Sequence, residues 1–375
     1  MNIHNAEVSL TQASNIEIKA INWIWNGWLA SGKFHVLGGM AGTGKSTIAI
    51  SICATVSSGR LFPDGQRAEQ GDVVIWTGED DPQDTLVPRL KAMGADLNRV
   101  HFVGTVNNGG ALRPFDPKKD MQSLQERIAK LRDIKLLVID PIVSTIKKDA
   151  NSNPDVRNDL APTVQMAAEL DFAVMGITHF SKNTLGNDPL ERITGSLAFG
   201  AIPRVVWAVT KVKTEDESDK RIIVRIKNNI GKDGGGFRYS LEQTAVNGID
   251  TSAVVWGESL SGSPEKIFRE AEGMPPEIIS KVEDCCEFIA NLLEDKPMKS
   301  TELEHRCKTA GFSFATQRSA RKKMKVRSFR VGGIGSAGEW LVSLPKMLLT
   351  DPSKNMSILG HVSQLSDENW VETEF

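Results

Sequence analysis

The sequence of 375 residues has little cysteine and no long apolar run. Its four cysteines are Cys53, Cys285, Cys286 and Cys307, and their spacing fits neither a disulfide framework nor a C-x-x-C metal site. We therefore expect reduced cysteines that pack in the interior. No apolar run reaches the roughly eighteen residues of a membrane span, and the first residues lack the basic-then-apolar order of a signal peptide. We expect a soluble, cytoplasmic protein without a membrane partner.

A large excess of either charge is absent as well. The formal net charge is −2, so the total charge does not demand a nucleic-acid partner, although a total can hide local asymmetry. The length and the 40% hydrophobic content allow one large domain and a small one.

Residues 39–46 match the phosphate-binding pattern G-x-x-x-x-G-K-S/T in full, between the apolar run 34–37 and the helix-like run 48–56. Glycines let the backbone N–H groups fold around the β- and γ-phosphates of ATP. Lys45 supplies a cation for these phosphates, and Ser46 a hydroxyl ligand for Mg²⁺. The predicted nucleotide-binding residues of this P-loop are Gly39, Ala41, Gly42, Thr43, Gly44, Lys45, Ser46 and Thr47.

Short β-rich runs alternate with helix-length segments after the P-loop, which is typical of βαβ units in a parallel sheet. Helices at 82–94, 118–133 and 155–170 lie between the first four strands of the chain. The predicted fold class is α/β, with a mostly parallel sheet flanked by helices. The expected strands lie at 73–78, 100–104, 135–140, 172–178 and 204–210, with 222–228 and 253–257 forming a more antiparallel edge.

The chain is predicted to divide into four parts. A nucleotide-binding domain spans 1–258, with 1–30 as a lead-in, and a linker rich in proline and glycine spans 259–276. A winged-helix-like domain at 277–345 and an irregular tail at 346–375 follow. The small domain is predicted from helices at 277–294, 300–310 and 315–325 and a hairpin-like segment at 326–344, the order of a winged helix-turn-helix.

Asp140 ends the apolar strand 135–140, which is the Walker B pattern. Its carboxylate would hold Mg²⁺ together with Ser46, while the alternative reading makes Asp140 a cap of the next helix. Pro141 follows, so the second acid of a DE-box is missing. The general base must therefore come from another strand end.

Glu79 follows the strand 73–76 and is the candidate for that base. In this position it could orient and deprotonate the water that attacks the γ-phosphate. The alternative for this segment is structural: Asp80 or Asp81 caps a helix that starts at Pro82. Both readings hold together, because base and cap are different residues.

Three further residues are candidates for contacts with ATP. His179 ends the strand 172–177 and can sense the γ-phosphate, unless it is a satisfied structural histidine. Arg204 starts the strand 205–207, too far along to serve its own P-loop, which suits an arginine finger that reaches a neighbouring copy; the alternative is a surface ion pair. Lys227 is a second candidate for such a contact, before the glycine-rich loop 231–236.

These residues together resemble the RecA-like AAA ATPases that are grouped with the RepA-type hexameric helicases of plasmids and phages. The resemblance implies a RecA-like core, an ATP site between subunits of a ring, and ATP-driven motion on single-stranded DNA. It implies Lys45 and Ser46 on phosphate and metal, Asp140 on Mg²⁺, Glu79 as base, His179 as sensor and Arg204 in trans. The segments that carry it are 23–28, 39–47, 77–82, 136–141, 149–153, 178–179, 195–204 and 227–229.

The same resemblance places DNA against two loops, 144–159 and 181–196. Their basic candidates are Lys147, Lys148, Lys182 and Arg192. Neither loop contains the stacking aromatics of a single-strand platform apart from Phe180 at its margin. The loops therefore leave translocation more open than ATP binding.

The segment 306–330 is strongly basic and contains no Asp or Glu. In a winged helix, 316–325 would be the recognition helix and 332–338 the wing. The alternative is a solvated helix face or a docking surface for another protein. The residues predicted to meet DNA phosphates are Arg318, Arg321, Lys322 and Lys325.

The sequence therefore predicts an enzyme that hydrolyses ATP with Mg²⁺ and acts on DNA. The expected assembly is a homo-oligomer, a hexameric ring or a spiral, working as a helicase-like motor in plasmid, phage or mobile-element replication. Two alternatives stay open: a non-translocating ATP switch that binds DNA and assembles, and an ATPase subunit of a defence or recombination complex. In the latter the basic helix would dock a replication protein or another protein partner.

Overall fold

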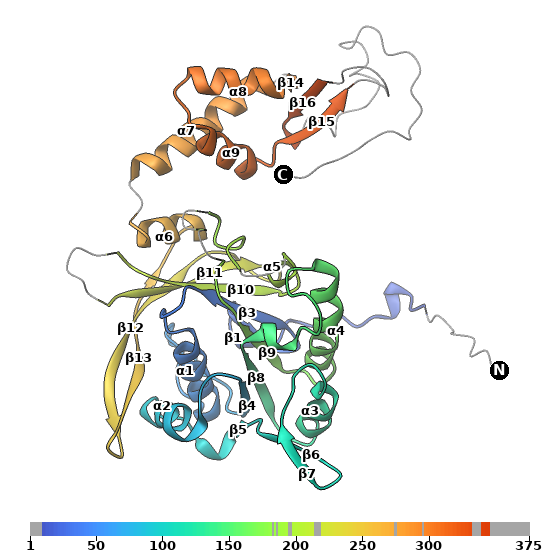
Figure 1. Cartoon of the computed structure of the whole chain (residues 1–375), viewed down its shortest axis with the longest axis vertical. Coiled ribbons are helices and arrows are strands. Elements are labelled where there is room, and N and C mark those ends of the chain that lie inside the picture. Colours follow the sequence, from blue (N-terminus) through green and yellow to red (C-terminus); the bar gives the residue numbers. More distant parts are fainter. Residues whose placement is uncertain are drawn as a thin grey trace, which may run out of the picture. The chain divides into compact units, whose positions relative to one another are not determined.

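The computed structural model describes residues 10–181, 184, 187–193, 197–213, 219–273, 276–294, 296–331 and 339–345. The chain forms two compact units, Met1–Gly273 and Met274–Phe375 (Figure 1). Their boundary falls inside the predicted linker at 259–276. The predicted wing at 332–338 and the whole predicted tail at 346–375 lie outside the described residues, as does Lys182.

A nine-stranded sheet forms the centre of the first unit, in the order β13-β12-β11-β10-β3-β9-β8-β4-β5. The pairs from β10 to β5 are parallel, and β10 to β13 form an antiparallel edge. The mostly parallel α/β sheet predicted from the sequence is thereby confirmed. The strands are β3 (Phe34–Gly39), β4 (Asp72–Thr77), β5 (Val100–Phe102), β8 (Ile134–Asp140), β9 (Ala173–Ile177), β10 (Val205–Lys211), β11 (Arg221–Asn228), β12 (Gly236–Val246) and β13 (Ile249–Leu260).

Helices cover both faces of this sheet, with α1 and α2 on one side and α3 and α4 on the other (Figure 1). The helices are α1 (Lys45–Ser58), α2 (Val87–Ala92), α3 (Met121–Ile128), α4 (Asn153–Glu169), α5 (Ala198–Ala201) and α6 (Pro264–Ala271). Single turns are η1 (Ala13–Asn15), η2 (Pro82–Leu86), η3 (Leu97–Arg99) and η4 (Ile142–Thr145), and two small ladders are β1 (Trp23–Trp25) with β2 (Leu29–Ala30) and β6 (Thr105–Asn108) with β7 (Ala111–Pro114).

The strand side chains alternate between two hydrophobic cores. Leu37 and Val138 pack with α1 in one core, while Val36 and Ile139 pack with α3 and α4 in the other. Successive side chains of a strand point to opposite faces, so strands buried on both sides need apolar residues at nearly every position. This explains why β3, β8 and β9 read as continuous apolar runs.

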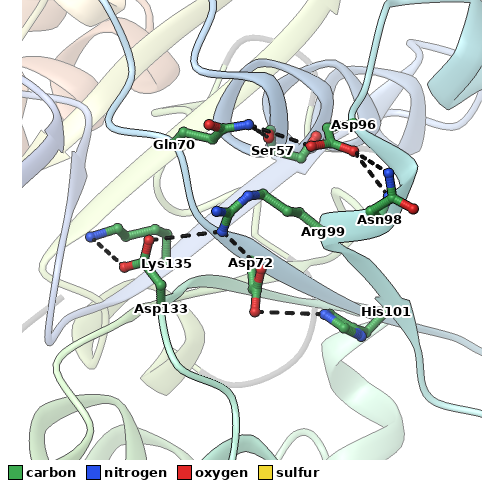
Figure 2. Close-up of polar contacts among 9 residues, drawn as sticks. All are labelled: Ser57, Gln70, Asp72, Asp96, Asn98, Arg99, His101, Asp133 and Lys135. Carbon is green, nitrogen blue, oxygen red and sulfur yellow. Dashed lines mark hydrogen bonds and ion pairs between the residues drawn. The ribbon is translucent and has the colours of Figure 1, made fainter.

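A network of ion pairs joins the amino ends of β4, β5 and β8 (Figure 2). The Arg99 guanidinium lies 3.2 Å from Asp72 and 3.9 Å from Asp133, and Lys135 lies 3.0 Å from Asp133. His101 Nε2 lies 3.8 Å from the second Asp72 oxygen. The pairs are partly exposed and each contributes at most about 1 kcal/mol, so they balance charge at this edge more than they stabilise the fold.

The structure differs from the sequence prediction after residue 230. β12 was not predicted, and the predicted strand 253–257 is only the middle of β13. The predicted linker contains α6, whose Ile267 and Phe268 are buried in the core and whose Ser263 side chain accepts a hydrogen bond from Lys266 N–H. The N-cap and the buried apolar pair stabilise a short amphipathic helix. The sequence analysis missed this helix because it read the proline and glycine content of the segment as that of a linker.

The second unit contains α7 (Pro276–Leu292), α8 (Ser300–Thr309), α9 (Phe314–Lys323) and a three-stranded sheet of β14 (Met298–Lys299), β16 (Glu339–Ser343) and β15 (Arg327–Val331). Its core includes Cys285, Cys307 and Val342. All four cysteines are free, as predicted, and burial raises the pKa of Cys285 to about 12. Burial raises the pKa of Cys53 and Cys307 as well, so these three buried thiols are packing residues with little thiolate at neutral pH.

None of the helices in the described parts of the chain combines the length and apolar character needed to cross a membrane.

A buried histidine in β3 makes the stability of the first unit depend on pH. His35 Nε2 accepts the Ala30 N–H at 3.0 Å, and Nδ1 lies 3.2 Å from the Val174 carbonyl, which requires the neutral ring. Burial lowers its pKa to about 4, whereas an unfolded histidine titrates near 6.5. Between pH 6.5 and 4 this histidine is therefore protonated in the unfolded state and neutral in the folded state. Stability should fall by about 3 kcal/mol as the pH drops from 6.5 to 4.

Urea unfolding followed by tryptophan fluorescence at a series of pH values measures this dependence. His35→Gln should flatten the slope of the unfolding free energy over this window by up to one proton. The exposed His305 of α8 is the control, and His305→Gln should leave the slope unchanged. Parallel profiles for His35→Gln and the parent protein would show that His35 does not titrate as described.

Candidate nucleotide site

The P-loop joins the end of β3 to the start of α1 at the carboxyl edge of the parallel strands. Gly44 has φ of 88°, in the left-handed region that favours glycine, and a Cβ on Gly39 would lie 2.6 Å from the Val209 carbonyl oxygen of β10. The loop thus depends on both glycines. Ala41, Gly42 and Thr43 lie between them, and the buried Thr47 lies in the first turn of α1.

Lys45 is the central cation of the site. Its ammonium donates to the carbonyls of Gly39 at 3.2 Å and Met40 at 3.0 Å, and it lies 3.1 Å from His179 Nδ1. Burial lowers the pKa of Lys45, and the negative charges of Asp140 and Glu79 oppose that shift. The ammonium therefore lies inside the loop where the phosphates of a nucleotide would bind.

Ser46 and Asp140 form the second contact of the site. Ser46 Oγ donates to Asp140 Oδ2 at 2.6 Å. Burial raises the pKa of Asp140, the bond from Ser46 lowers it, and the charges of Glu79 and Asp80 raise it again. A hydroxyl and a carboxylate are the oxygen ligands that Mg²⁺ prefers, and such sites complete their coordination with phosphate and water. The pair therefore fits a Mg²⁺ ion in the position predicted from the sequence.

Glu79 lies close to these charges without being tied to its own loop. Asp80 pairs with Arg89 at 3.0 Å, and the Asp81 carboxylate accepts two backbone N–H groups of η2, so these two acids have structural roles. Glu79 instead influences the pKa of Lys45, Asp140 and His179. It is the acid of this segment that the structure leaves available for chemistry.

His179 follows β9 and faces the Lys45 ammonium. Burial lowers the pKa of His179, and the positive charge of Lys45 lowers it further, while Glu79 opposes the shift. The ring is therefore neutral at neutral pH, with Nδ1 as the acceptor that faces Lys45. The four predicted residues from three different strand ends and α1 thus converge on one place.

The β12–β13 hairpin holds the P-loop from outside, a contact that the sequence analysis missed. Tyr239 Oη donates to the Thr43 carbonyl at 2.7 Å, and Leu241 lies against Gly44. Trp256 Nε1 donates to Ser51 Oγ of α1 at 3.3 Å. The alternation of Phe237, Tyr239 and Leu241 on one face of β12 was the available signal, although it does not name the P-loop as partner.

Arg204 lies far from the P-loop of its own copy. Its backbone N–H donates to the carbonyl of Phe34, the first residue of β3, at 3.0 Å. The P-loop begins after Gly39, so the two sites lie at opposite ends of β3, about 16 Å apart along the strand. The Arg204 side chain is exposed, and it has no hydrogen bond or ion pair with any described residue.

Lys227 of β11 is bound to the backbone of its own chain. Its ammonium donates to three carbonyls, those of Gly200 and Ala201 at 2.8 Å and Pro203 at 2.9 Å. An ammonium has three N–H donors, so all are occupied. This arrangement supports a structural role for Lys227 and does not support the predicted contact with a nucleotide.

The structure also corrects the prediction that Arg192 contacts DNA. Its side chain is 1% exposed, pairs with Glu272 at 2.5 Å and stacks on Phe180, with 4.4 Å from the guanidinium carbon to the ring centroid. A guanidinium buried in this way and paired with a buried carboxylate cannot reach a phosphate outside the fold. Lys147 and Lys148 are exposed on the turn after η4, and Lys148 lies 3.7 Å from Asp155.

The basic residues of α9 divide into two groups. Arg321 was predicted to contact DNA, but its guanidinium bonds to Ser300 and lies 3.3 Å from Glu304 within the unit. Lys322 is exposed and already has an interaction within the protein. Arg318 of α9 and Lys325 of the turn after it are exposed, and neither side chain has a hydrogen bond or ion pair with another residue in the described ranges.

Residues 4–184 match the model of a protein family described as AAA domain. The match includes the P-loop, Glu79, Asp140 and His179, and it shows that this stretch is similar to AAA-type domains of the P-loop superfamily. No curated protein matches the chain. The fold, the P-loop and the family match together suggest an ATPase. Arg204, Lys227 and the second unit lie outside the matched residues.

The hydrogen bond from Tyr239 to the P-loop should contribute to nucleotide affinity. Tyr239→Phe removes the donor to the Thr43 carbonyl and should weaken binding of a fluorescent ATP analogue with Mg²⁺ about two- to tenfold. Trp256→Phe is the matched control, because it removes a hydrogen bond from the same hairpin to α1 away from the loop. Equal affinities of Tyr239→Phe and the parent protein would contradict this role.

Proposed function

We propose that this chain hydrolyses ATP with Mg²⁺ as a homo-oligomeric motor of the RepA-type helicase kind, in the cytoplasm. The observation that carries the ATPase proposal is the convergence of two hydrogen-bonded pairs, Lys45 with His179 and Ser46 with Asp140, with the charge of Glu79 acting on Lys45 and Asp140. These groups come from α1 and from the ends of three adjacent parallel strands, which is where α/β sheets place their ligands.

The chemistry follows from what each group can do. Lys45 exchanges the carbonyls of Gly39 and Met40 for phosphate oxygens, and Ser46 and Asp140 hold Mg²⁺, which neutralises phosphate charge when it is bound. Glu79 accepts the proton of the water that attacks the γ-phosphate in line. Neutral His179 detects the γ-phosphate through the position of Lys45 and passes the change to the loop that follows β9.

Glu79 and Lys45 should separate binding from hydrolysis. Glu79→Gln should bind ATP as the parent protein does and lose hydrolysis by about 100-fold or more, because the variant keeps the shape and loses the base. Lys45→Ala should lose both binding and hydrolysis and gives the blank rate. Steady-state phosphate release and nucleotide titration measure the two quantities. A Glu79→Gln enzyme with near-parent turnover would remove Glu79 from the mechanism.

Arg204 is the proposed contribution of a neighbouring copy to this site. It is exposed, lacks a partner among the described residues and lies at the opposite end of β3 from the P-loop of its own copy. A guanidinium that reaches the γ-phosphate in the transition state stabilises the developing charge. An interface that brings Arg204 of one copy to the P-loop of the next copy would build a hexameric ring or a spiral.

The second unit is the proposed DNA-binding module, of winged-helix type. Three helices, a short strand before α8 and the β15–β16 pair support this assignment. Arg318 and Lys325 are two exposed cations of this unit whose side chains have no hydrogen bond or ion pair with another described residue. Single-stranded DNA is the proposed partner, and replication of a plasmid, phage or mobile element the proposed setting.

Salt dependence tests the DNA contact of α9. The double variant Arg318→Ala with Lys325→Ala should weaken binding of labelled single-stranded DNA, and should reduce the slope of log K against log salt by about 1.4. Arg306→Ala is the control, because Arg306 lies in the same basic segment and is already paired with Glu302 at 2.7 Å. An unchanged slope in the double variant would mean that α9 serves a protein partner.

A non-translocating ATP switch is the second candidate function. It is favoured by the burial of Arg192, which removes one of the few basic residues from the predicted DNA loops. The motor predicts that single strands stimulate ATP hydrolysis. The switch predicts ATP-dependent assembly with a slow rate that single-stranded and duplex DNA leave unchanged.

A further inference from the structure

Lys227 projects from β11 next to β10, where its neighbour in register is Val206. From there its ammonium reaches the turn that leaves α5. The three carbonyls that it binds belong to Gly200, Ala201 and Pro203, at 2.8, 2.8 and 2.9 Å. α5, β10 and β11 lie side by side in the first unit (Figure 1).

These carbonyls have a particular place in the chain. Gly200 and Ala201 end α5, where carbonyls lack partners within the helix and favour a cation. Pro203 is the residue directly before Arg204. Lys227 thus binds the end of α5 and the peptide that leads into Arg204 with one group.

The sheet fixes Arg204 itself on both sides. Its N–H donates to the Phe34 carbonyl at 3.0 Å, and its carbonyl accepts the Asn229 N–H at 2.9 Å. The direction in which the chain enters this position is set by the turn at 200–203. Among the described residues outside α5 and this turn, Lys227 is the one whose side chain donates hydrogen bonds to the carbonyls of the turn.

Arg204 and Lys227 are also close enough to influence each other. Burial lowers the pKa of Lys227, and the positive charge of Arg204 lowers it further. Two cations this close repel, which disfavours an Arg204 side chain that folds back toward the Lys227 ammonium. The Arg204 side chain is exposed, which agrees with this preference.

We propose that Lys227 is a positioning residue that holds the turn at 200–203, so that Arg204 extends toward the ATP site of a second copy of this chain. This inference rests on the proposed trans role of Arg204. It gives Lys227 a role other than a phosphate contact, since a phosphate contact would require the loss of all three carbonyl bonds.

Mixed oligomers test this separately from the trans role. A Lys45→Ala copy cannot bind ATP and still offers Arg204, and an Arg204→Ala copy has an intact site and offers no arginine. Each is expected to be inactive alone, and a mixture should regain hydrolysis at sites where the two meet. Adding Lys227→Met to the Lys45→Ala donor should lower kcat of the mixture tenfold or more. KM for ATP should stay unchanged, because the acceptor site is untouched.

Placing Lys227→Met in the acceptor copy instead of the donor copy separates the positioning of Arg204 from a general disturbance of the fold. Lys227→Met in the Arg204→Ala acceptor should leave the activity of the mixture unchanged, because that copy offers no arginine to position. Lys232→Met in the donor is the matched control, since Lys232 is an exposed lysine of the next loop. Lys227→Arg in the donor should restore part of the activity, because a guanidinium also donates to carbonyls.

The outcomes are distinct. A parent mixture without hydrolysis overturns the trans role, and the inference with it. An active parent mixture that is unaffected by Lys227→Met in the donor overturns the inference alone. Equal losses in donor and acceptor, or a raised KM, overturn it as well, because they show damage to the fold or direct contact with ATP.

Discussion

The pairing of β3 with β9 on one side and β10 on the other is the constraint on which the rest of the first unit depends. At the carboxyl end of β3, Gly39 opens the P-loop and β9 delivers His179. At its amino end, the Phe34 carbonyl binds the backbone of Arg204. One strand thus carries a nucleotide-facing end and an arginine-bearing end. In the proposed oligomer, contact between these unlike surfaces is heterologous, and contacts of this kind generate a closed ring or an open spiral.

The sequence allowed prediction of the groups at strand ends, because parallel strands bring their carboxyl ends to one edge. Asp140, Glu79 and His179 were found in this way, and the structure places them around Lys45. Partners separated by long stretches of chain were not predictable. The burial of Arg192 depends on Glu272, eighty residues later, and the position of Lys227 depends on the turn that precedes β10, 27 residues earlier in the chain. A basic residue in a loop and one in a core look alike until their partners are known.

The Arg192–Glu272 pair has a physical consequence for the loop after His179. Both side chains are almost fully buried, and the guanidinium also stacks on Phe180, the residue next to His179. Removing one partner of such a pair leaves a buried charge and costs about 3–5 kcal/mol, far more than a surface pair. Arg192 is therefore held to Glu272, the residue that follows α6 near the end of the first unit. Arg192 is thus an anchor of the chain that follows Phe180 and not a contact for DNA.

The order of the strands also bears on how the protein is made. β3 emerges early in synthesis, yet its two neighbours are β9 and β10, which follow after more than a hundred residues. The hairpin that carries Tyr239 to the P-loop is made later still. Contacts of such long range fold slowly, and the strands formed first expose apolar edges until their partners arrive. A chain that stopped at residue 184, where the family match ends, would keep the phosphate-binding sequence but lack β10 and the hairpin that holds its loop.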